Sequence, residues 1–457
     1  MFTRASVLGV CAALAFGGAA SAADKPWLMH DAVAAPSNLK LSGTFRARYE
    51  TIDSAARAGV PRNEDYITLR TTLFAEYAAG PLRIGGELWD SRIYDADLPS
   101  SAGANEVNTF EPVQAYAAVD LKDPLGLPGK ATLQAGRFLL NIGSRRLVAA
   151  DDYRNTTNGY TGLRGDFLGR DFSLTAYAVT PQIRLPDSQA DVLDNRARLD
   201  KETNDTLLWG ALVDRNVSKA TTLEFGYVGF KEQDAVGRPT RDRDLATFTG
   251  RVLRNPAPER FDIDAEVGYQ TGSVSSSALP GATTLDAEAG FFHLRAGYSF
   301  ADAWKSHVSF DYDWVEGDDS GPKYRRFDTL FGMRRADFSP GGLYSLVGRA
   351  NISSPGARWE ATFDRRWDGM LSYHPMWLAS STDSFSNSNV RDATGRSGDF
   401  AGHQWDGRVR YWLVPGSVRL EGVYILVNKG RFLREAPNAP SGDRNTNYLA
   451  LIVTSTF

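Results

Sequence analysis

The chain has 457 residues, of which 42% are hydrophobic and 23% charged, and its formal net charge is −4 at pH 7. A negative chain argues against nucleic acid as a partner, because nucleic-acid-binding proteins need a basic surface to neutralise phosphates. The single cysteine, Cys11, lies in a segment that we expect to be removed. The remaining residues then offer no thiol for a disulfide, a zinc–thiolate site or a cysteine nucleophile.

Residues 1–22 have the features of a secretory signal peptide. Arg4 supplies a positive charge, residues 7–16 form a short apolar core, and Ala20-Ser21-Ala22 is an A-x-A cleavage site. The apolar core is too short to cross a bilayer as a helix. We therefore expect an exported chain, in which residues 23–38 form a short periplasmic segment ahead of a barrel at 39–457.

From about residue 39 to the end, apolar and polar side chains alternate in segments of roughly ten residues, a length typical of a tilted membrane strand. In FDIDAEVGYQ (261–270) the apolar side chains take the odd positions, and acidic or amide side chains take most of the even ones. HVSFDYDW (307–314), where the apolar side chains take the even positions, and LKLSGTFRARYE (39–50) alternate in the same way. A period of two predicts strands with one apolar face and one charged face.

Turn-forming residues separate these segments. We expect short turns at 78–81 (AAGP), 353–356 (SSPG) and 414–417 (VPGS), and longer polar loops at 181–204, 271–286 and 380–402. A soluble β-sandwich also has alternating strands. The number of strands, their charged face and the contrast between short turns and long loops favour an antiparallel up-and-down barrel in the outer membrane.

The last segment, NYLALIVTSTF (447–457), alternates as well and finishes on Phe457. A barrel in lipid must pair its last strand with its first, because an open edge would leave backbone groups without hydrogen bonds. The strand that finishes on Phe457 also resembles the signal that directs outer-membrane barrels to the barrel-assembly machinery. We expect this strand to serve as both wall and sorting signal.

One region is more polar than a barrel wall requires: AGRFLLNIGSRRLVAADDYRNTTNGYTGLR, residues 135–164. It resembles the alginate-export family of outer-membrane proteins, in which a GR-x-x-L element leads through an arginine and a W-R-N-T segment to F-D-G-x-R. Residues 324–360 are similar to the family's later F-D-x-L-x-G block. Tyr153, Asn158 and Thr161 depart from the pattern and put the identity of the substrate in doubt. The matching positions are Gly136, Arg137, Leu140, Arg146, Leu147, Arg154, Asn155, Thr156, Gly162 and Arg164.

The resemblance implies an all-β transmembrane barrel of about 18 strands, whose narrow, arginine-lined pore passes an acidic polysaccharide. Each arginine placed by strand parity could instead be a wall residue paired with a carboxylate on the next strand. The pore-lining candidates that carry over from the motif are Arg137, Arg146, Arg154 and Arg164. Those placed on the inner face by parity alone are Arg46, Arg48, Arg70, Arg349, Arg358, Arg408 and Arg410.

No catalytic or metal-binding pattern stands out. The acidic segment 313–321 lacks the spacing of an EF-hand, the five histidines form no HExxH motif, and no nucleophile lies beside a base. We therefore expect a channel without enzymatic activity, cofactor or bound metal. It would either export an anionic polysaccharide or, as a porin, take up small anionic solutes. The expected partners are outer-membrane lipid and lipopolysaccharide, the barrel-assembly machinery, the transported anion and periplasmic secretion proteins.

Overall fold

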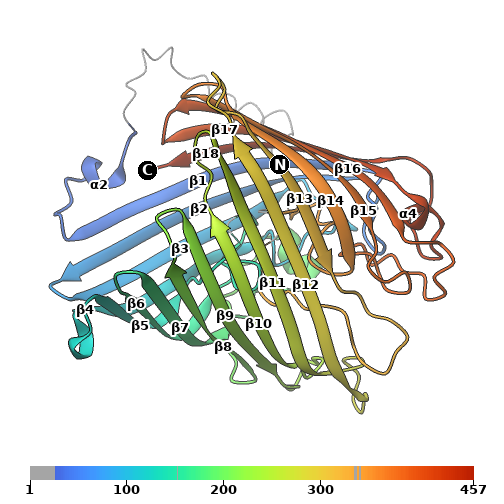
Figure 1. Ribbon diagram of the computed structural model, residues 1–457, viewed down its shortest axis with the longest axis horizontal. Coiled ribbons are helices and arrows are strands. Elements are labelled where there is room, and N and C mark those ends of the chain that lie inside the picture. Colours follow the sequence, from blue (N-terminus) through green and yellow to red (C-terminus); the bar gives the residue numbers. More distant parts are fainter. Residues whose placement is uncertain (1–25, 152, 334–336, 339–340) are drawn as a thin grey trace.

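The computed structural model describes residues 26–151, 153–333, 337–338 and 341–457, so the expected signal peptide at 1–22 lies outside the described residues. Eighteen strands form one antiparallel sheet, in which neighbours in the chain are neighbours in space (Figure 1). β1 (Leu39–Asp53) also pairs with β18 (Thr446–Thr456). This pairing closes the sheet and confirms the predicted up-and-down barrel.

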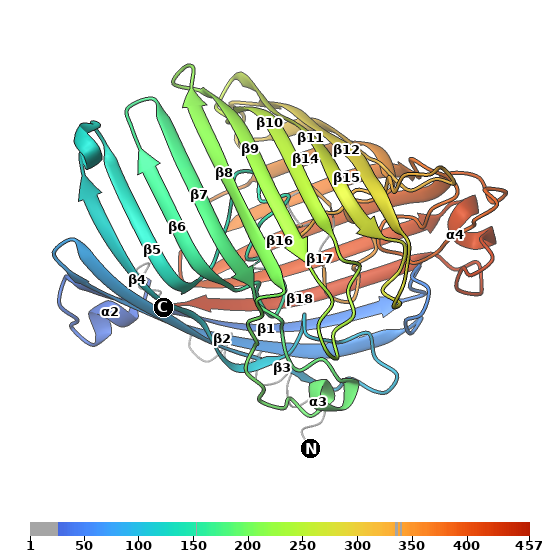
Figure 2. The same cartoon turned by 90° about the horizontal axis from the view of Figure 1, so that it is seen from below.

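The tilted wall is seen from a second side in Figure 2. The helices are short: α2 (Met29–Ala32), α3 (Gln189–Leu193), α4 (Arg431–Glu435) and the 3-10 helix η1 (Pro124–Gly126). Within the described ranges, no helix is long and apolar enough to cross a membrane. The strands between β1 and β18 are β2 (Glu64–Ala79), β3 (Leu82–Tyr94), β4 (Asn108–Lys122), β5 (Lys130–Phe138), β6 (Tyr160–Leu168), β7 (Phe172–Pro181), β8 (Thr206–Asn216), β9 (Thr221–Glu232), β10 (Asp244–Arg254), β11 (Arg260–Ser275), β12 (Thr284–Ser299), β13 (His307–Val315), β14 (Ile352–Thr362), β15 (Trp367–Trp377), β16 (Phe400–Val414) and β17 (Val418–Lys429).

The two rims of the barrel differ, as predicted. At the short-turn rim, two residues separate β2 from β3 and three separate β16 from β17, which confirms the turns at 78–81 and 414–417. At the opposite, long-loop rim, β7 and β8 are joined by residues 182–205, and β15 and β16 by residues 378–399. These loops agree closely with those predicted at 181–204 and 380–402.

Two of the turn and loop predictions were wrong. Residues 353–356 lie inside β14, where Pro355 is opposite Tyr312 of β13 and the register to β15 is interrupted between Ser353 and Ala357. Proline has no N–H to donate, so it is tolerated where the ladder on one side is broken. The loop expected at 271–286 contains only residues 276–283, because β11 and β12 continue on either side of it.

The longer hairpin has a packing cause. Val274 of β11 and Ala287 of β12 are buried with Leu245 of β10, and Tyr324 and Leu330 pack against them. Tyr324 and Leu330 belong to the segment between β13 and β14, which folds against the inside of the wall. Burial of apolar surface therefore stabilises strand residues that polar composition alone assigned to a loop.

The wall faces follow the predicted parity. In β11, Phe261 and Val267 are exposed on the outside, whereas Asp262 and Glu266 are buried on the inside. β11 therefore presents an apolar outer face and a charged inner face, as expected for a strand of a membrane barrel.

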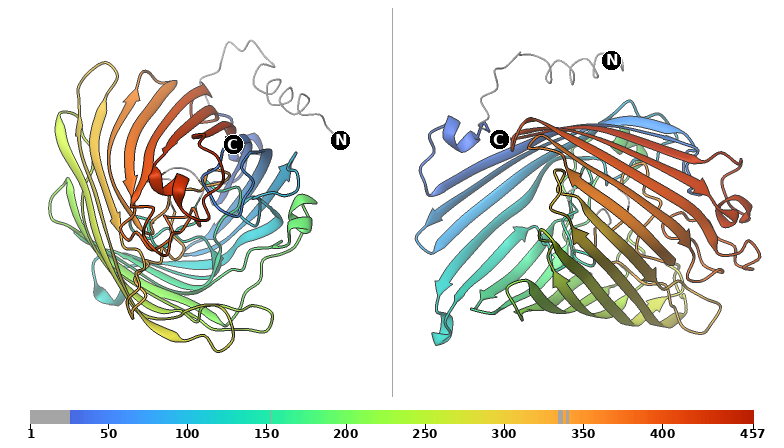
Figure 3. Two further views of the ribbon diagram at one scale, coloured as in Figure 1. Left: turned by 90° about the vertical axis from the view of Figure 1, so that its right-hand side faces the viewer. Right: turned by 45° about the horizontal axis from the view of Figure 1, so that its top comes forward.

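Two long segments fold into the lumen: inner loop 139–159, between β5 and β6, and inner loop 316–351, between β13 and β14. Val148 of the first pairs with Phe331 of the second. Leu140, Val148 and Leu343 belong to the main buried cluster. Loop segments are visible inside the ring of strands in Figure 3, left. The barrel's core thus lies in its lumen, between the wall and the two regions that resemble the family motifs.

Candidate functional site

Wall arginines hold inner loop 139–159 by its backbone. Arg46 of β1 lies directly opposite Arg70 of β2, and both donate to the carbonyl oxygen of Arg154, from Nη2 at 2.5 Å and Nη1 at 3.1 Å respectively. Arg48 donates to the carbonyl oxygen of Tyr153 at 2.9 Å. Like charges directly opposite each other destabilise a sheet, and the shared carbonyl oxygen offsets part of that cost.

Asn155 fixes the same loop from within. Its buried side-chain amide lies within hydrogen-bond distance of the carbonyl oxygens of Leu69 (3.0 Å), Arg92 (3.3 Å) and Glu106 (2.8 Å). Ser91 donates to the backbone carbonyl of Asn155 at 2.6 Å. The Arg-Asn pair of the family motif is therefore the docking point of the loop on β2 and β3.

Arg146 connects both inner loops to the wall. Its buried guanidinium pairs with Asp264 (3.1 Å) and Glu266 of β11, and with Asp337 (2.8 Å) of inner loop 316–351. Asp337 also pairs with Arg349. Burial alone would raise the pKa of the Asp337 carboxyl, but Arg146, His293 and Arg349 together hold it well below the ordinary value.

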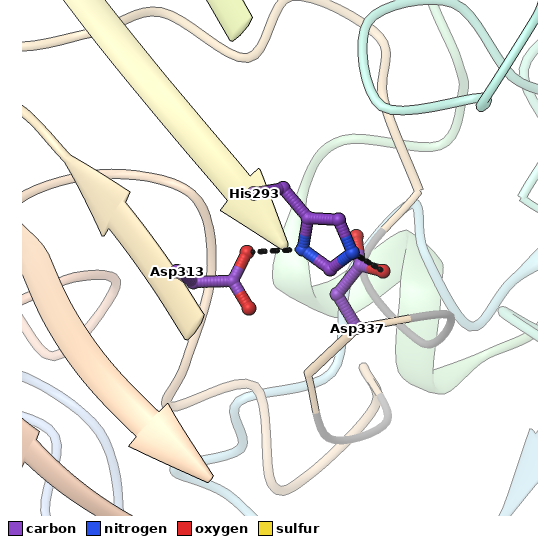
Figure 4. Close-up of side chains that lie close together, drawn as sticks. All are labelled: His293, Asp313 and Asp337. Atoms are coloured by element: carbon purple, nitrogen blue, oxygen red, sulfur yellow. Dashed lines mark hydrogen bonds and ion pairs between the residues drawn. The ribbon is translucent and has the colours of Figure 1, made fainter. Parts of the chain in front are cut away.

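His293 completes this central ionic cluster (Figure 4). Its Nδ1 lies 2.8 Å from Asp313 Oδ1 and its Nε2 lies 3.7 Å from Asp337 Oδ1, and the three residues are close enough together to suggest a metal site. However, the Asp337 carboxylate is already paired with two guanidinium groups, which would oppose a metal cation at short range. The arrangement favours a structural cluster of charges over a metal centre.

Two cavities along the inner wall bring several arginines together. Arg46, Arg70, Arg410 and Arg419 line a cavity of about 230 Å³ with Tyr153 beside them, and Glu421 is the carboxylate among the lining residues. The Arg410 guanidinium lies 3.1 Å from Glu421 and 3.7 Å from Asp368. Part of the positive charge in this cavity is therefore compensated.

A second cavity, of about 460 Å³, opens toward the short-turn rim and shares Arg410 with the first. Arg408, which also lines it, lies 3.9 Å from both Glu360 and Asp368. Basic residues outnumber acidic ones in both cavities, so the two form a basic track from the rim to inner loop 139–159. The residues of this basic track are Lys305, Arg365, Arg366, Arg408, Arg410, Arg419, Arg46 and Arg70.

The other candidate arginines lie elsewhere. Arg137 on β5 pairs with Glu111 (2.5 Å) and Glu202 (3.0 Å), and Arg164 on β6 pairs with Asp166 (2.7 Å). Arg154 itself pairs with Asp151 at 2.8 Å, and Arg358 on β14 lies 3.7 Å from Asp311. None of these four lines the two cavities of the basic track.

Two of the arginines assigned by parity are buried among other groups. Arg48 is fully buried, with Nε 3.0 Å from Glu50 and its guanidinium over the Tyr153 ring. Arg349 lies in inner loop 316–351 and not on a strand, so strand parity does not apply to it. We therefore leave both residues out of the basic track.

Sequence reasoning missed Arg419. Arg419 and Glu421 alternate with the apolar residues Leu420 and Val418 in VRLEG, so parity would have placed it on the inner face. Lys305, Arg365 and Arg366 lie in turns at the short-turn rim, where no periodic signal exists. The docking role of Asn155 had no signal beyond the motif match.

Two buried carboxyl groups in loops of the long-loop rim have raised pKa values. Burial raises the pKa of Glu106 to about 7. Burial and the neighbouring Glu111 carboxylate raise that of Asp200 to about 7, although Asn108 and the Leu185 N–H donate to Asp200. Both pKa values exceed the ordinary carboxyl value of about 4, so the folded loops bind protons more tightly than unfolded ones. Proton binding therefore stabilises the folded loops at low pH, and this stabilisation is lost as pH rises through about 7.

We therefore expect loops 95–107 and 182–205 to be held more firmly at pH 6 than at pH 8. Limited proteolysis, normalised to an unfolded substrate at each pH, should show faster cleavage of both loops at pH 8. Asp200→Asn keeps a hydrogen-bond acceptor and removes the titrating charge, so it should flatten the profile of loop 182–205. An unchanged profile in Asp200→Asn would contradict this assignment.

Residues 37–447 match the protein family described as Alginate export. The chain belongs to the alginate export family. Both motif blocks of the sequence fall inside the matched range, and in the structure they form the inner loops and their flanking strands. Membership of the alginate export family therefore agrees with the resemblance carried by Arg137, Arg154 and their neighbours. No curated protein matches the sequence.

Solved structures with a similar fold include three proteins from Pseudomonas. Pseudomonas aeruginosa OccD3 (OpdP) is 14% identical with a TM-score of 0.57, over 92% of this chain and 91% of that one. A BenF-like porin from Pseudomonas fluorescens Pf-5 is 10% identical with a TM-score of 0.59, over 92% and 99%. P. aeruginosa OccK2 (OpdF) is 13% identical with a TM-score of 0.57, over 95% and 99%. At these identities the likeness establishes the fold of this alginate export family member and nothing about its substrate.

Proposed function

We propose that this protein is a channel of the bacterial outer membrane that passes an anionic, alginate-like exopolysaccharide. The observation that carries the proposal is the basic track, which places eight Lys and Arg residues along two cavities that share Arg410, in a chain with a net negative charge. Family membership and the porin-like fold support an outer-membrane channel. Short turns of such barrels face the periplasm, so the basic track would open on that side.

The electrostatics suit a polymer that must keep moving. A guanidinium in a confined lumen attracts a carboxylate more strongly than it would in open water. Nearby carboxylates such as Glu421 and Asp368 moderate each site, and a row of moderate sites lets a polyanion pass from one to the next. The charges bind and guide the polymer, and the proposal includes no catalytic step.

A second candidate, uptake of small anionic solutes, is favoured by the packing of the lumen. The inner loops are held by buried ion pairs, and the two cavities of the basic track measure only about 230 and 460 Å³. These volumes are of the size that binds a small molecule. A polymer would need the inner loops to move.

The proposal has further parts beyond the lumen. Residues 1–22 would direct export and be removed, and residues 23–38 would lie in the periplasm. The barrel-assembly machinery would recognise the strand that finishes on Phe457. The apolar exterior would contact membrane lipid and lipopolysaccharide, and periplasmic secretion proteins would deliver the polymer.

Planar-bilayer conductance of the purified protein tests the transport proposal. We expect an anion-selective current that oligomers of a uronic acid block at lower concentration than the monomer does. Equal block by monomer and oligomer would favour the small-solute porin. A cation-selective current would overturn both.

Arg410→Gln combined with Arg419→Gln should shift the reversal potential toward cation selectivity and weaken oligomer block about tenfold, because two of the four guanidinium groups of the inner cavity are removed. Arg46, Arg48 and Arg70 donate to the backbone carbonyls of Tyr153 and Arg154 and are unchanged in this variant, so the inner loop should stay docked. The matched control is Arg215→Gln at the short-turn rim, which lies outside the basic track and should change neither quantity. Unchanged selectivity in the double variant would remove the inner cavity from the ion path.

A further inference from the structure

The ring of Phe457 lies over Gly43 at the seam where the barrel closes. The N–H of Phe457 donates to the Gly43 carbonyl oxygen at 2.9 Å, and the N–H of Gly43 donates to that of Phe457 at 2.7 Å. The closing ladder thus continues one residue beyond β18. A Cβ atom at Gly43 would lie 2.4 Å from Cε2 of Phe457, so the missing side chain leaves a notch that the ring fills.

Trp27 packs against the same ring. The centroids of the Trp27 and Phe457 rings are 5.8 Å apart, a distance typical of favourable aromatic pairs. Trp27 comes just before α2, which lies beside the C-terminal end of the chain in both Figure 1 and Figure 3, right. Thr44 and Arg46 point inward by strand parity, so Gly43 and both rings are on the outer face of the wall.

The seam is the place where such a contact matters most. Every other neighbouring pair of strands is joined by a turn or loop, whereas no turn or loop connects β1 and β18 directly. Strand ends without a connecting turn fray at low free-energy cost. At the short-turn rim, the aromatic contact stands where a covalent turn would otherwise hold the two strands.

We propose that Gly43 and Trp27 form a clasp around Phe457, in which Gly43 provides the notch and Trp27 the cover. The clasp keeps the β1–β18 seam closed at the short-turn rim. The clasp is independent of what the channel transports. It assigns a role to Trp27 in the segment before β1, and it makes Gly43 a positioning residue for the ring.

The chain contains a matched control for the notch. Gly229 of β9 lies opposite Trp209 of β8, and a Cβ there would lie 2.2 Å from Cε2 of that ring. The substitution Gly229→Ala therefore introduces a similar clash with an aromatic ring, at a strand pair whose ends are joined by residues 217–220.

Hydrogen exchange of the purified protein tests the clasp. Gly43→Ala should speed exchange of the short-turn halves of β1 and β18 about tenfold, and Gly229→Ala should leave the seam unchanged. The new methyl group would also approach the Thr72 carbonyl oxygen of β2, so faster exchange in β18 is the diagnostic result. Equal seam exchange in the Gly43 and Gly229 variants would overturn the proposal.

A double-mutant cycle tests the contact between the Trp27 and Phe457 rings and leaves Gly43 unchanged. Trp27→Ala and Phe457→Ala should each speed seam exchange about threefold to tenfold, the range expected for loss of one aromatic pair. Trp27→Ala should have no further effect in the Phe457→Ala background, because the contact is already absent. Additive effects would show that the two rings act separately and that no clasp exists.

Discussion

Asn155→Ala should detach inner loop 139–159 from the wall and raise single-channel conductance at least about twofold. The two N–H groups of the Asn155 side chain are shared among the carbonyl oxygens of Leu69, Arg92 and Glu106. Each buried carbonyl left without a donor costs about 1–3 kcal/mol. This cost falls on the docked state of the loop, so the undocked state should become populated and the lumen should widen.

The control for this prediction is Asn158→Ala, three residues along the same loop. The Asn158 amide donates to Ala149 within the loop and to Phe331 of the other inner loop, so its removal leaves the contacts with β2 and β3 in place. We expect conductance close to that of the unchanged protein. If Asn158→Ala raised conductance as much as Asn155→Ala, docking on the wall would not be what limits the current.

Asp337→Ala should destabilise the barrel more than any other single change considered, by about 3–5 kcal/mol, because it removes the carboxylate that two buried guanidinium groups share. Arg146 and Arg349 both pair with Asp337 inside the central ionic cluster. The expected results are a lower midpoint of thermal unfolding and protease cleavage within residues 316–351. Thermal denaturation and limited proteolysis of the purified protein measure these two effects.

Asp319→Ala provides the comparison in the same loop. Its carboxylate is about half exposed and lies 3.8 Å from Arg325, an exposed pair of the kind that contributes about 1 kcal/mol or less. The unfolding midpoint should therefore hardly change. A similar loss of stability in both variants would mean that the central ionic cluster does not hold the inner loops.

The wall of this barrel could be predicted from the sequence because strand geometry imposes strict alternation. Phe261, Asp262 and their neighbours in β11 face outward and inward as their positions require. The same rule would have identified Arg419. The turn signal was misleading at residues 353–356, where Pro355 is accommodated by a local break in one ladder and does not end the strand.

The interior could not be predicted in the same way. The inner loops have no period, and their conformation depends on contacts between residues far apart in the sequence, such as Arg146 with Asp337. Strand parity therefore assigned Arg349 a wall position that it does not have. The motif located Arg154 and Asn155 but not their task, because docking of a backbone carbonyl on two wall arginines depends on tertiary structure alone.

The placement of the packed core in the lumen links the stability of this barrel to the width of its passage. Residues such as Leu140 and Val148 are buried as in any stable domain, yet they also stand in the space through which a solute would travel. Substitutions that enlarge the passage will tend to weaken the fold, and those that tighten the packing will tend to reduce flux. Evolution toward a wider or different substrate would therefore need compensating changes in the wall, and variants selected for throughput should prove less heat-resistant.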